Sequence, residues 1–484
     1  MTKSNYLIGL KCPRSLWITK NDKESLPEIN LSTQHRFDTG HKVGELAKEY
    51  FKGGINIPED DFNNSLRLSK EYLDKREILF EAGFKFERCY SRADILKPVG
   101  KDEWDLIEVK SGTKVKEENI HDVSFQKYVY ENLGIKIRDC YLMYINNEYE
   151  KQGDLNIKEL FTLENINSEV EEYTEGIKDG IDSMLENIDS KQYNESKFGK
   201  HCENPKECPL PEFDWNFLPQ YSVFNLYNIR VKKAMEYYNG GFLDMKDLTP
   251  DIKLNSKQRI QVDCEIDNKT HVDSKGIKLF LNTLEYPLYY IDFETYNPAI
   301  PVYDNMKPYQ RIPFQFSLHI QHKPKGKLEH KEFLSDGKKD PREEFISLIK
   351  DWCGDNGSII TFNKAFEKGV LNETTKFLPK YQEWLDTINE RIIDLLDVFR
   401  DFNYYNPKQE GSCSIKKVLP SIYPEKNHKH LDISDGMTAS IEYEKSVWEY
   451  TDKKQIEKIR KNLLDYCCLD TIAMVYIKEE LEKL

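Results

Sequence analysis

The first candidate constellation is a set of charged residues on two adjoining predicted strands. Asp94 lies at the end of one predicted strand, and Glu108 and Lys110 lie on the next. Because side chains alternate across a strand, Glu108 and Lys110 project from one face while Val109 turns toward the core. Two carboxylates can hold Mg²⁺ or Mn²⁺ through hard oxygen ligands, and the ammonium can orient an attacking water or stabilise charge on a phosphate. A solvated surface hairpin carries the same residue types, so both interpretations stay open.

Two neighbouring segments extend this constellation. Gln126 and Tyr130 are four residues apart on a helix predicted over 116–133, so they share one helical face. Glu45 lies on a helix predicted over 36–51, where it is either an assisting metal ligand or plain surface charge.

The second constellation begins with Asp292 and Glu294 at the end of an apolar, β-rich run. The two carboxylates share a face, and Phe293 points the other way. Like charges that are buried together are costly unless a cation pairs with them. A D-x-E pattern that closes a buried strand therefore indicates a metal site.

Two later segments carry further acids. Asn363-x-x-Phe366-Glu367 follows another short predicted strand, and Tyr466 and Asp470 lie one turn apart on the predicted C-terminal helix. With Asp292 and Glu294 they supply four carboxylates and a tyrosine. Any one of these motifs can consist of ordinary polar residues at a strand end or on a helix face. That explanation fits all three motifs together less well.

Four further charged residues in the second half of the chain have only open interpretations. Asp394 and Asp397 lie in a strand or helix, where a supporting role is open. Lys416 and Lys417 follow a Gly-Ser turn, where they contact substrate phosphate or belong to a solvated loop.

The elements that must position these residues follow from periodicity and turn signals. Strands are predicted within 84–98 and 104–112, joined as a hairpin, and within 138–146. A long charged helix is predicted over 165–190. Later strands are predicted within 286–295, 315–322 and 358–363, with helices over 341–353 and 453–483. The predicted class is therefore α/β (α+β).

Length and charge set the outer limits. A chain of 484 residues is long enough for two or three domains. The net charge of −14 argues against a protein that coats DNA, but metal-holding carboxylates add negative charge to a nuclease. The chain has no long uncharged apolar run and no signal-peptide pattern, so we expect a cytoplasmic protein without membrane contact.

The first half resembles the PD-(D/E)XK nucleases of the RecB type. Their pattern is G-R-x-D, then E-x-K on a strand, then Q-x-x-x-Y on a helix; here Ser91 replaces the glycine. The resemblance implies catalytic roles for Asp94, Glu108, Lys110, Gln126 and Tyr130, and it implies metal binding by Asp94 and Glu108 with help from Glu45.

The cysteines extend this resemblance. The stretch KCPRSLW around Cys12 looks like the opening of the CRISPR-associated iron–sulfur nucleases, in which that cysteine and three later ones hold a cluster. Here the later positions are Cys202, Cys208 and Asp214. Thiolates are the normal ligands of such clusters, so a labile cluster, a degenerate or zinc-occupied site and buried thiols all stay open. Cys89 and Cys140, within apolar strands, are expected to be core residues.

The second half resembles the RNase H-like 3′–5′ exonucleases of the DEDD type, whose motifs D-x-E, N-x-x-F-D and Y-x-x-x-D occur in this order. The resemblance implies that Asp292, Glu294, Glu367 and Asp470 grip two divalent ions while Tyr466 positions water. Glu367 stands where those exonucleases usually have Asp, and its extra methylene moves the carboxylate, which can shift the affinity or preference for metal.

The whole chain resembles an uncharacterised bacterial family that fuses the two modules. This implies a restriction-endonuclease-like domain over 1–214, a helical connector over 215–280 and an RNase H-like domain, a mixed sheet flanked by helices, over 281–484. The implied activity is metal-dependent hydrolysis of nucleic acid, with DNA favoured over RNA, in DNA processing, repair or antiviral defence. Two alternatives stay open: one module only binds and positions nucleic acid, or the chain is a non-catalytic scaffold of a nucleic-acid complex.

Overall fold

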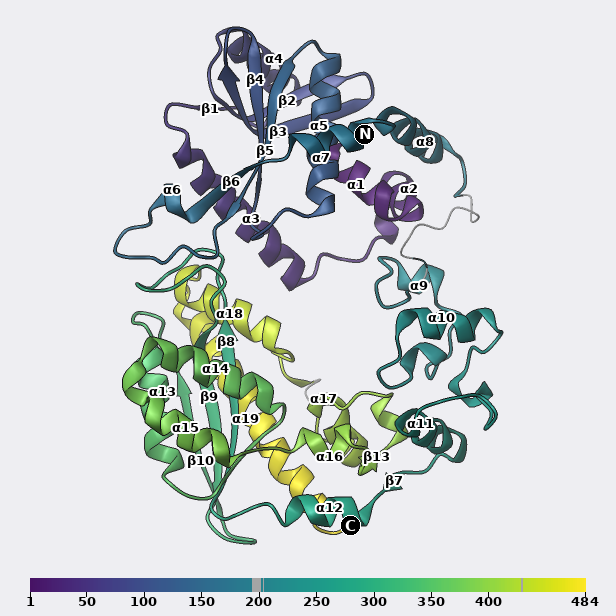
Figure 1. Cartoon of the computed structure of the whole chain (residues 1–484), viewed down its shortest axis with the longest axis vertical. Helices are drawn as coiled ribbons and strands as arrows, with labels where there is room; N and C mark the ends of the chain where they lie inside the picture. Colours follow the sequence, from purple (N-terminus) through teal and green to yellow (C-terminus); the bar gives the residue numbers. More distant parts are fainter. Residues whose placement is uncertain (194–201, 203, 428–429) are drawn as a thin grey trace. The chain divides into compact units, whose positions relative to one another are not determined.

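A computed structural model describes residues 1–193, 202, 204–427 and 430–484. It is a mixed α/β structure with three sheets (Figure 1). The chain divides into two compact bodies. Unit 1 comprises Met1–Asn216 and Pro298–Gln310, and unit 2 comprises Phe217–Asn297 and Arg311–Leu484.

Unit 1 is built on a six-stranded sheet in the order β1-β2-β3-β4-β5-β6. β1 pairs with β2, and β4 with β5, in parallel; the other pairs are antiparallel. The strands are β1 (Ile55–Asn56), β2 (Leu79–Phe86), β3 (Cys89–Val99), β4 (Glu103–Lys110), β5 (Lys136–Ile145) and β6 (Phe161–Asn165). The predicted hairpin is therefore confirmed, and Gly100 takes the left-handed conformation at its turn, with φ of 53°.

Helices pack on this sheet through an apolar core. Phe125 and Val129 of the fifth helix join Leu106 and Leu142 of the strands in one buried cluster, which also holds the two cysteines expected there, Cys89 and Cys140. The helices are α1 (Lys3–Lys11), α2 (Pro13–Asn21), α3 (Leu31–Tyr50), α4 (Phe62–Asp74), α5 (Glu117–Asn132), α6 (Ile157–Leu160), α7 (Asn167–Thr174), α8 (Ile177–Asp189) and α9 (Pro211–Asp214).

Two predictions about unit 1 were wrong in detail. The long helix over 165–190 is broken into α7 and α8, because Gly176 takes a left-handed conformation with φ of 87°. Asp94 lies in the middle of β3 rather than at its end, because pairing with β4 continues through Val99.

Unit 1 also contains the segment Pro298–Gln310, which follows a strand of unit 2 in sequence. Ala299 belongs to a buried cluster with Val43 and Ala47 of α3. The Tyr309 hydroxyl donates to the backbone carbonyl of Ser111, just after β4. The predicted domain limits did not include this excursion, because the sequence of a short loop carries no signal of the unit on which it packs.

Unit 2 is built on a five-stranded sheet in the order β10-β9-β8-β11-β12. β8 (Leu288–Tyr296) pairs antiparallel with β9 (Ile312–Gln321), which pairs antiparallel with β10 (Leu328–Leu334). β11 (Ser358–Thr361) is parallel to both β8 and β12 (Ile392–Asp394). The central strand β8 thus carries the D-x-E motif.

Helices cover both faces of this sheet (Figure 1). One buried cluster joins Phe293 and Phe316 to Phe345, and the cluster on the other face joins Tyr290 and Ile360 to the C-terminal helix. The helices are α13 (Arg342–Cys353), α14 (Lys364–Phe377), α15 (Gln382–Arg391), α16 (Leu396–Arg400), α17 (Ile415–Ile422), α18 (Gly436–Trp448) and α19 (Lys453–Leu481).

The stretch predicted as a helical connector contains α10 (Val231–Asn239), α11 (Ser256–Asp267) and α12 (Ser274–Leu281), and it groups with unit 2. It also contains the short strand β7 (His271–Val272), which pairs with β13 (Tyr404–Tyr405). Among the described residues, no helix is both long enough and apolar enough to span a bilayer.

Candidate active sites

The first site lies at the end of β4, where Glu108 is almost fully buried at 1% exposure. The Lys110 ammonium lies 2.6 Å from Glu108 Oε1 and 2.7 Å from Asp122 Oδ2 of α5. Asp94 reaches the same place from β3, since its Oδ2 accepts the backbone N–H of Val109 at 2.8 Å. Burial of this kind rules out the solvated hairpin and brings the predicted acids and lysine together.

A second lysine completes the site, and the sequence carried no signal for it. Lys3 of α1 places its ammonium 2.9 Å and 3.1 Å from the two oxygens of Glu108 and 3.5 Å from Asp94 Oδ1. Lys3 and Glu108 are 105 positions apart in sequence, so only folding joins them. Asp122 was missed for a simpler reason: it is one turn before Gln126 and resembles any acidic residue of an amphipathic helix.

The charges of the first site largely balance one another. Burial, and then the neighbouring Glu108, raise the pKa of Asp94 to about 7. Burial also opposes ionisation of Glu108, but Lys110 and Lys3 outweigh it and hold the pKa of that carboxyl below its usual range. Glu108 is therefore an anion held by two ammonium groups.

The remaining predicted residues of the first site differ in their surroundings. Gln126 is buried and donates to Glu108 Oε2 at 2.6 Å and to Asp122 Oδ1 at 3.1 Å. Tyr130 is fully buried, and its hydroxyl lies 3.4 Å from Ser91 Oγ, at the position where the nuclease pattern has glycine. Glu45 pairs with Lys48 at 2.6 Å and keeps 55% of its side chain exposed, so its metal role stays a prediction.

The predicted cluster ligands have other hydrogen-bond partners. Cys12 caps α2, because its sulfur accepts the backbone N–H of Ser15 at 3.3 Å. Cys208 lies 3.4 Å from Asp214 Oδ2, and Arg14 forms an ion pair with the same carboxylate. Burial raises the pKa of Cys208 to about 11 and also raises that of Cys12.

Thiols with raised pKa values are poor metal ligands until they lose their protons. Only two sets of three possible ligand residues in the described chain have their ligand atoms within 4.8 Å of one another, and neither contains Cys12, Cys202, Cys208 or Asp214. In the described chain these residues are therefore not gathered for a single metal ion, and the raised pKa values of Cys12 and Cys208 oppose the thiolate forms that an iron–sulfur cluster needs.

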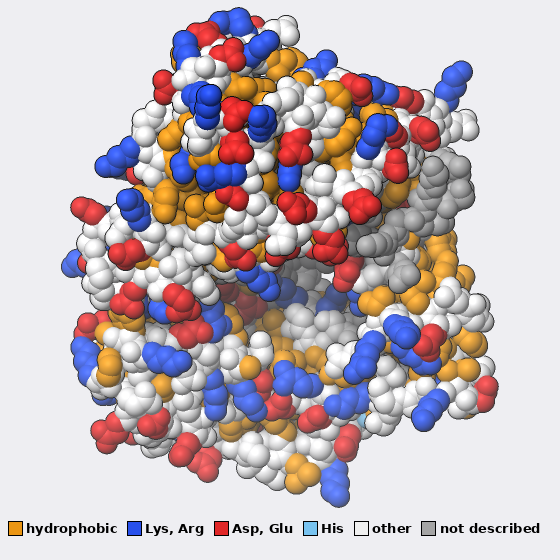
Figure 2. All heavy atoms as spheres, turned by 45° about the horizontal axis from the view of Figure 1, so that its top comes forward, with side chains coloured by type: hydrophobic (Ala, Val, Ile, Leu, Met, Phe, Trp, Pro, Cys, Tyr) orange, Lys and Arg blue, Asp and Glu red, His pale blue; other side chains and the backbone are white. Residues whose placement is uncertain are grey.

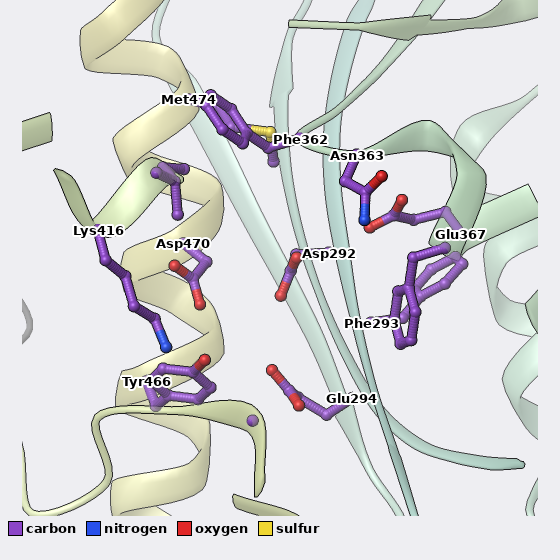
Figure 3. Close-up of a pocket in the computed structure, with 13 residues that line it drawn as sticks. Asp292, Phe293, Glu294, Phe362, Asn363, Glu367, Lys416, Tyr466, Asp470 and Met474 are labelled. Carbon is purple, nitrogen blue, oxygen red and sulfur yellow. The ribbon is translucent and has the colours of Figure 1, made fainter. Parts of the chain in front are cut away.

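The second site brings together three of the predicted carboxylates. Asp292 and Glu294 from β8 and Asp470 from α19 have oxygens within 4.8 Å of one another. They line a pocket of about 230 Å³. Figure 3 shows the three carboxylates pointing into the same space from the strand and the helix. Phe293 turns into the core on the other face, as alternation along the strand predicted.

Glu367 enters the same pocket from α14 (Figure 3). Its side chain is buried, and its Oε2 has no hydrogen-bond partner among the described residues. Asp394 sets the start of this helix, because its carboxylate accepts the backbone N–H groups of Asn363 at 2.9 Å and Lys364 at 3.1 Å. Asp394 is thus a positioning residue, while Asp397 pairs with Lys364 at 3.0 Å.

Two further residues line the pocket on the side of α19 (Figure 3). Burial, and then Asp470 and Glu294, raise the pKa of Tyr466 far above its usual range, so its hydroxyl stays protonated. The Lys416 ammonium lies 5.1 Å from the Tyr466 ring centre. Lys417 instead pairs with Glu410 at 2.5 Å, so of the two lysines Lys416 is the one at the pocket.

The acids of the second site strongly disfavour each other's ionisation. Burial, followed by repulsion from Asp470, raises the pKa of Glu294 to about 8 and raises that of Asp292 well above its usual range. Burial also raises the pKa of Glu367 to about 8. Lys416 lowers the pKa of Glu294 without overcoming these effects.

These features fit divalent cations. Hard carboxylate oxygens converge from separate elements, and one buried Glu367 oxygen has no other partner in the described chain. A bound cation would stabilise the ionised forms that burial now disfavours. Asp292, Glu294, Asp470 and Glu367 are the residues that would hold it.

The surface is mixed in charge. Figure 2 shows Lys and Arg side chains interspersed with Asp and Glu across the face that it presents, without one large basic patch. In this view, the protein with its net charge of −14 presents no broad positively charged surface.

Comparisons with known proteins relate part of this chain to proteins of unknown function. Residues 289–414 match the family model described as "Domain of unknown function (DUF2779)". This range contains Asp292, Glu294 and Glu367 and ends before Asp470.

Three relatives match at similar levels. The "Uncharacterized protein MG366 homolog" of Mycoplasma pneumoniae is 30% identical over 234 residues, which cover 43% of this chain and 34% of the relative. The "Uncharacterized protein MG366" of Mycoplasma genitalium is 29% identical, over 40% of this chain and 32% of the relative. The "Uncharacterized protein UU173" of Ureaplasma parvum is 28% identical, over 45% of this chain and 34% of the relative.

The matched part of the chain spans about a third of the length of these relatives. None of their names states an activity, so the resemblance to the two nuclease classes stays a prediction.

Proposed function

We propose that this protein is a metal-dependent nuclease with two active sites, one in each unit. The observation that carries the proposal is the convergence of Asp292, Glu294 and Asp470 within 4.8 Å, in a pocket that buried Glu367 also lines. A set of buried acids that repel one another is costly unless cations bind there. Phosphodiester hydrolysis is the reaction for which such paired-ion carboxylate sites are best suited.

In unit 2 we propose 3′–5′ exonuclease activity. Bound Mg²⁺ or Mn²⁺ would supply an activated water and stabilise the leaving oxygen. The protein's own contribution is positional. β8 and α19 hold the carboxylates, and the protonated hydroxyl of Tyr466 orients the water. Lys416 lies where it can attract the phosphate backbone of a strand that enters the pocket.

In unit 1 we propose a RecB-type site. Asp94 and Glu108 would hold a divalent ion, and the ammonium of Lys110 would stabilise charge on the scissile phosphate. Gln126 orients Glu108 through its 2.6 Å hydrogen bond. DNA is the proposed substrate, and DNA processing, repair or antiviral defence is the proposed setting.

One observation favours a second candidate, in which only unit 2 hydrolyses nucleic acid. Lys3 and Lys110 already neutralise Glu108, so the first site needs no ion to be stable. Unit 1 would then bind and position the strand that unit 2 degrades.

The test is digestion of end-labelled single- and double-stranded DNA and RNA by the full chain with Mg²⁺ or Mn²⁺. We expect progressive shortening of 5′-labelled strands from the 3′ end, stopped by EDTA and nearly abolished in Asp292→Asn. Asp397→Asn is the matched control, because Asp397 lies outside the pocket and pairs with Lys364. A ladder that persists unchanged in Asp292→Asn would remove the exonuclease from unit 2.

A further inference from the structure

A second set of possible metal ligands lies in unit 2 outside the acidic pocket. His319 of β9, His330 of β10 and Cys468 of α19 each offer an atom within 4.8 Å of the others. His319 and His330 are directly opposed in the antiparallel pairing of their strands. The topology of the sheet therefore brings together two imidazoles, and α19 adds a thiol.

This set belongs to an unusually polar strip under a long helix. Gln315 and His319 alternate with Phe316 and Leu318 along β9, and the polar side chains turn toward α19. Gln315 donates to the carbonyl of Leu463 at 2.7 Å. An apolar strip would pack there more simply, so the polar strip calls for an explanation beyond packing.

The hydroxyl groups around the imidazoles form an ordered chain. Thr471 Oγ1 lies 3.1 Å from the carbonyl of Cys468, 2.9 Å from His319 Nδ1 and 2.7 Å from Ser317 Oγ. Ser317 Oγ lies 3.0 Å from His330 Nε2. If Thr471 donates to the carbonyl and Ser317 donates to Thr471, both hydroxyl oxygens accept from a ring N–H.

That arrangement would fix the tautomer of both rings. His319 would donate from Nδ1 and His330 from Nε2, which would leave the lone pairs of His319 Nε2 and His330 Nδ1 available to an ion. A ring that donates one N–H to a hydroxyl or carbonyl while its other nitrogen faces outward is the arrangement of a metal-bound histidine.

A carboxylate lies next to this set, although it is not among the three residues whose ligand atoms lie within 4.8 Å of one another. Glu332 lies two residues after His330 on β10, and its Oε2 is 4.0 Å from His330 Nε2. The Glu332 carboxylate also acts electrostatically on the Cys468 thiol. The side chains of His330 and Glu332 are 30% and 41% exposed, so an ion can enter from solvent.

We propose that His319, His330 and Cys468, with Glu332 as a fourth ligand, form a binding site for Zn²⁺ or a similar transition-metal ion. Imidazole and thiolate ligands select such ions over Mg²⁺. Bond lengths of about 2.0–2.1 Å to nitrogen and about 2.3 Å to sulfur require the ligand atoms to close by roughly 1 Å, which the exposed His330 side chain permits. Binding releases the Cys468 proton.

The ion would fasten α19 to the β9–β10 hairpin. Thr471, which connects the two histidines through hydroxyl groups, directly follows Asp470, and Ser317 pairs with Asp292 across the sheet. The site is thus a structural clamp beside the acidic pocket. It does not depend on the proposed nuclease activity.

The test is a titration of the chelator-treated full chain with Co²⁺. Mg²⁺ is present in excess, so that it occupies the sites made of hard oxygen ligands and leaves Co²⁺ for the proposed site. We expect one equivalent of Co²⁺ to produce a thiolate-to-metal absorption band and a tetrahedral visible spectrum, both abolished by Zn²⁺. Cys468→Ser should remove the band, and His330→Ala should weaken Co²⁺ binding by at least about tenfold. Two matched controls, His322→Ala on the same hairpin and Cys208→Ser in unit 1, should bind as the unaltered chain does.

A second readout does not depend on the spectrum. Zn²⁺ in excess Mg²⁺ should raise the thermal midpoint of the unaltered chain and of His322→Ala, but not of His330→Ala. His330 is partly exposed near the sheet edge, so its replacement leaves the fold intact, which far-ultraviolet circular dichroism checks. The absence of a thiolate band in the unaltered chain, or a band that survives in Cys468→Ser, would overturn the proposal.

Discussion

The two acidic sites of this protein solve the same electrostatic problem in opposite ways. In unit 1 the buried Glu108 lies between two ammonium groups, those of Lys3 and Lys110. In unit 2 Asp292 and Glu294 lie with Asp470, and Lys416 is the only Lys or Arg among the described residues that line the pocket. The first site keeps Glu108 ionised with its own cations, whereas burial and mutual repulsion in the second site raise the pKa values of Asp292 and Glu294 and so favour their protonated forms.

This difference has a consequence for metal dependence. An ion that enters unit 1 must displace the Lys3 ammonium, whereas an ion that enters unit 2 relieves repulsion. We therefore expect tighter divalent-cation binding and a stronger gain in stability at unit 2. The predictions below are ordered from the largest expected effect to the smallest.

The largest effect should come from the charged residues of unit 1. In an Asp292→Asn background, Glu108→Ala or Lys110→Ala should abolish the remaining metal-dependent cleavage, because each removes a metal ligand or the cation that faces the phosphate. Gel assays on labelled DNA measure this loss. If both variants retain the full residual rate, unit 1 only binds nucleic acid.

In unit 2, Tyr466→Phe should reduce exonuclease activity by about 10²-fold, because the ring remains while the hydroxyl that orients water is lost. This loss should be smaller than that of Asp292→Asn. Glu367→Asp should keep substantial activity, while Glu367→Gln should not, if the carboxylate binds metal. Initial rates on 5′-labelled strands decide between these outcomes, and equal loss in both Glu367 variants would contradict a ligand role.

Lys3→Met tests whether the Lys3 ammonium competes with a metal ion for the carboxylates of the first site. Without Lys3, Mn²⁺ should bind unit 1 at least about tenfold more tightly, the equivalent of about 1.4 kcal/mol. Calorimetry in the Asp292→Asn background measures the affinity. Lys11→Met is the matched control, because Lys11 lies on the same helix and pairs with exposed Glu118. Equal affinities in the two variants would show that Lys3 does not compete with the ion.

Stability should depend on pH with opposite sign for Glu108 of unit 1 and for the acids of unit 2. Asp94 of unit 1, whose pKa is raised to about 7, acts in the same direction as the acids of unit 2. In unit 2 the pKa values of Glu294 and Glu367 are raised from 4.5 to about 8, so the folded protein binds more protons than the unfolded chain between these values. Without metal, the free energy of unfolding should therefore fall as the pH rises from about 4.5 to about 8. In unit 1 the pKa of Glu108 is lowered. The contribution of Glu108 to the free energy of unfolding should therefore be lost only as the pH falls below 4.5.

Thermal unfolding in EDTA from about pH 8 to well below pH 4.5 measures both slopes. Saturating Mn²⁺ should prevent the fall in the free energy of unfolding at higher pH, because a bound ion keeps the carboxylates ionised in the folded state. Glu294→Gln should flatten the slope in EDTA. A stability that rises with pH over this window in the unaltered chain would contradict the electrostatic description of unit 2.

The smallest effect is expected at the cysteines of unit 1. Because Arg14 already pairs with Asp214 and the Cys208 thiol is held protonated, anaerobically purified protein should show little or no iron–sulfur absorption. Iron and sulfide analysis gives the same information independently. Stoichiometric iron and sulfide that disappear in Cys12→Ser would prove this expectation wrong.

The sequence by itself determined the local features of both sites. Alternation along the strands predicted that Glu108 and Lys110 share a face and that Phe293 turns into the core, because the side-chain period of a strand does not depend on its partners. Helical spacing likewise predicted the shared faces of Gln126 with Tyr130 and Tyr466 with Asp470. These are properties of single elements, for which neighbouring residues are sufficient.

Tertiary structure decided what surrounds those side chains. Lys3 reaches Glu108 from 105 positions away, the segment 298–310 packs into unit 1, and the imidazoles of His319 and His330 meet only because β9 and β10 pair in one register. Desolvation and nearby charge, rather than residue type, determine whether a buried carboxylate is paired or protonated. The sequence therefore indicated where acids lie, while the fold determined that one site supplies its own cations and the other favours ions from solution.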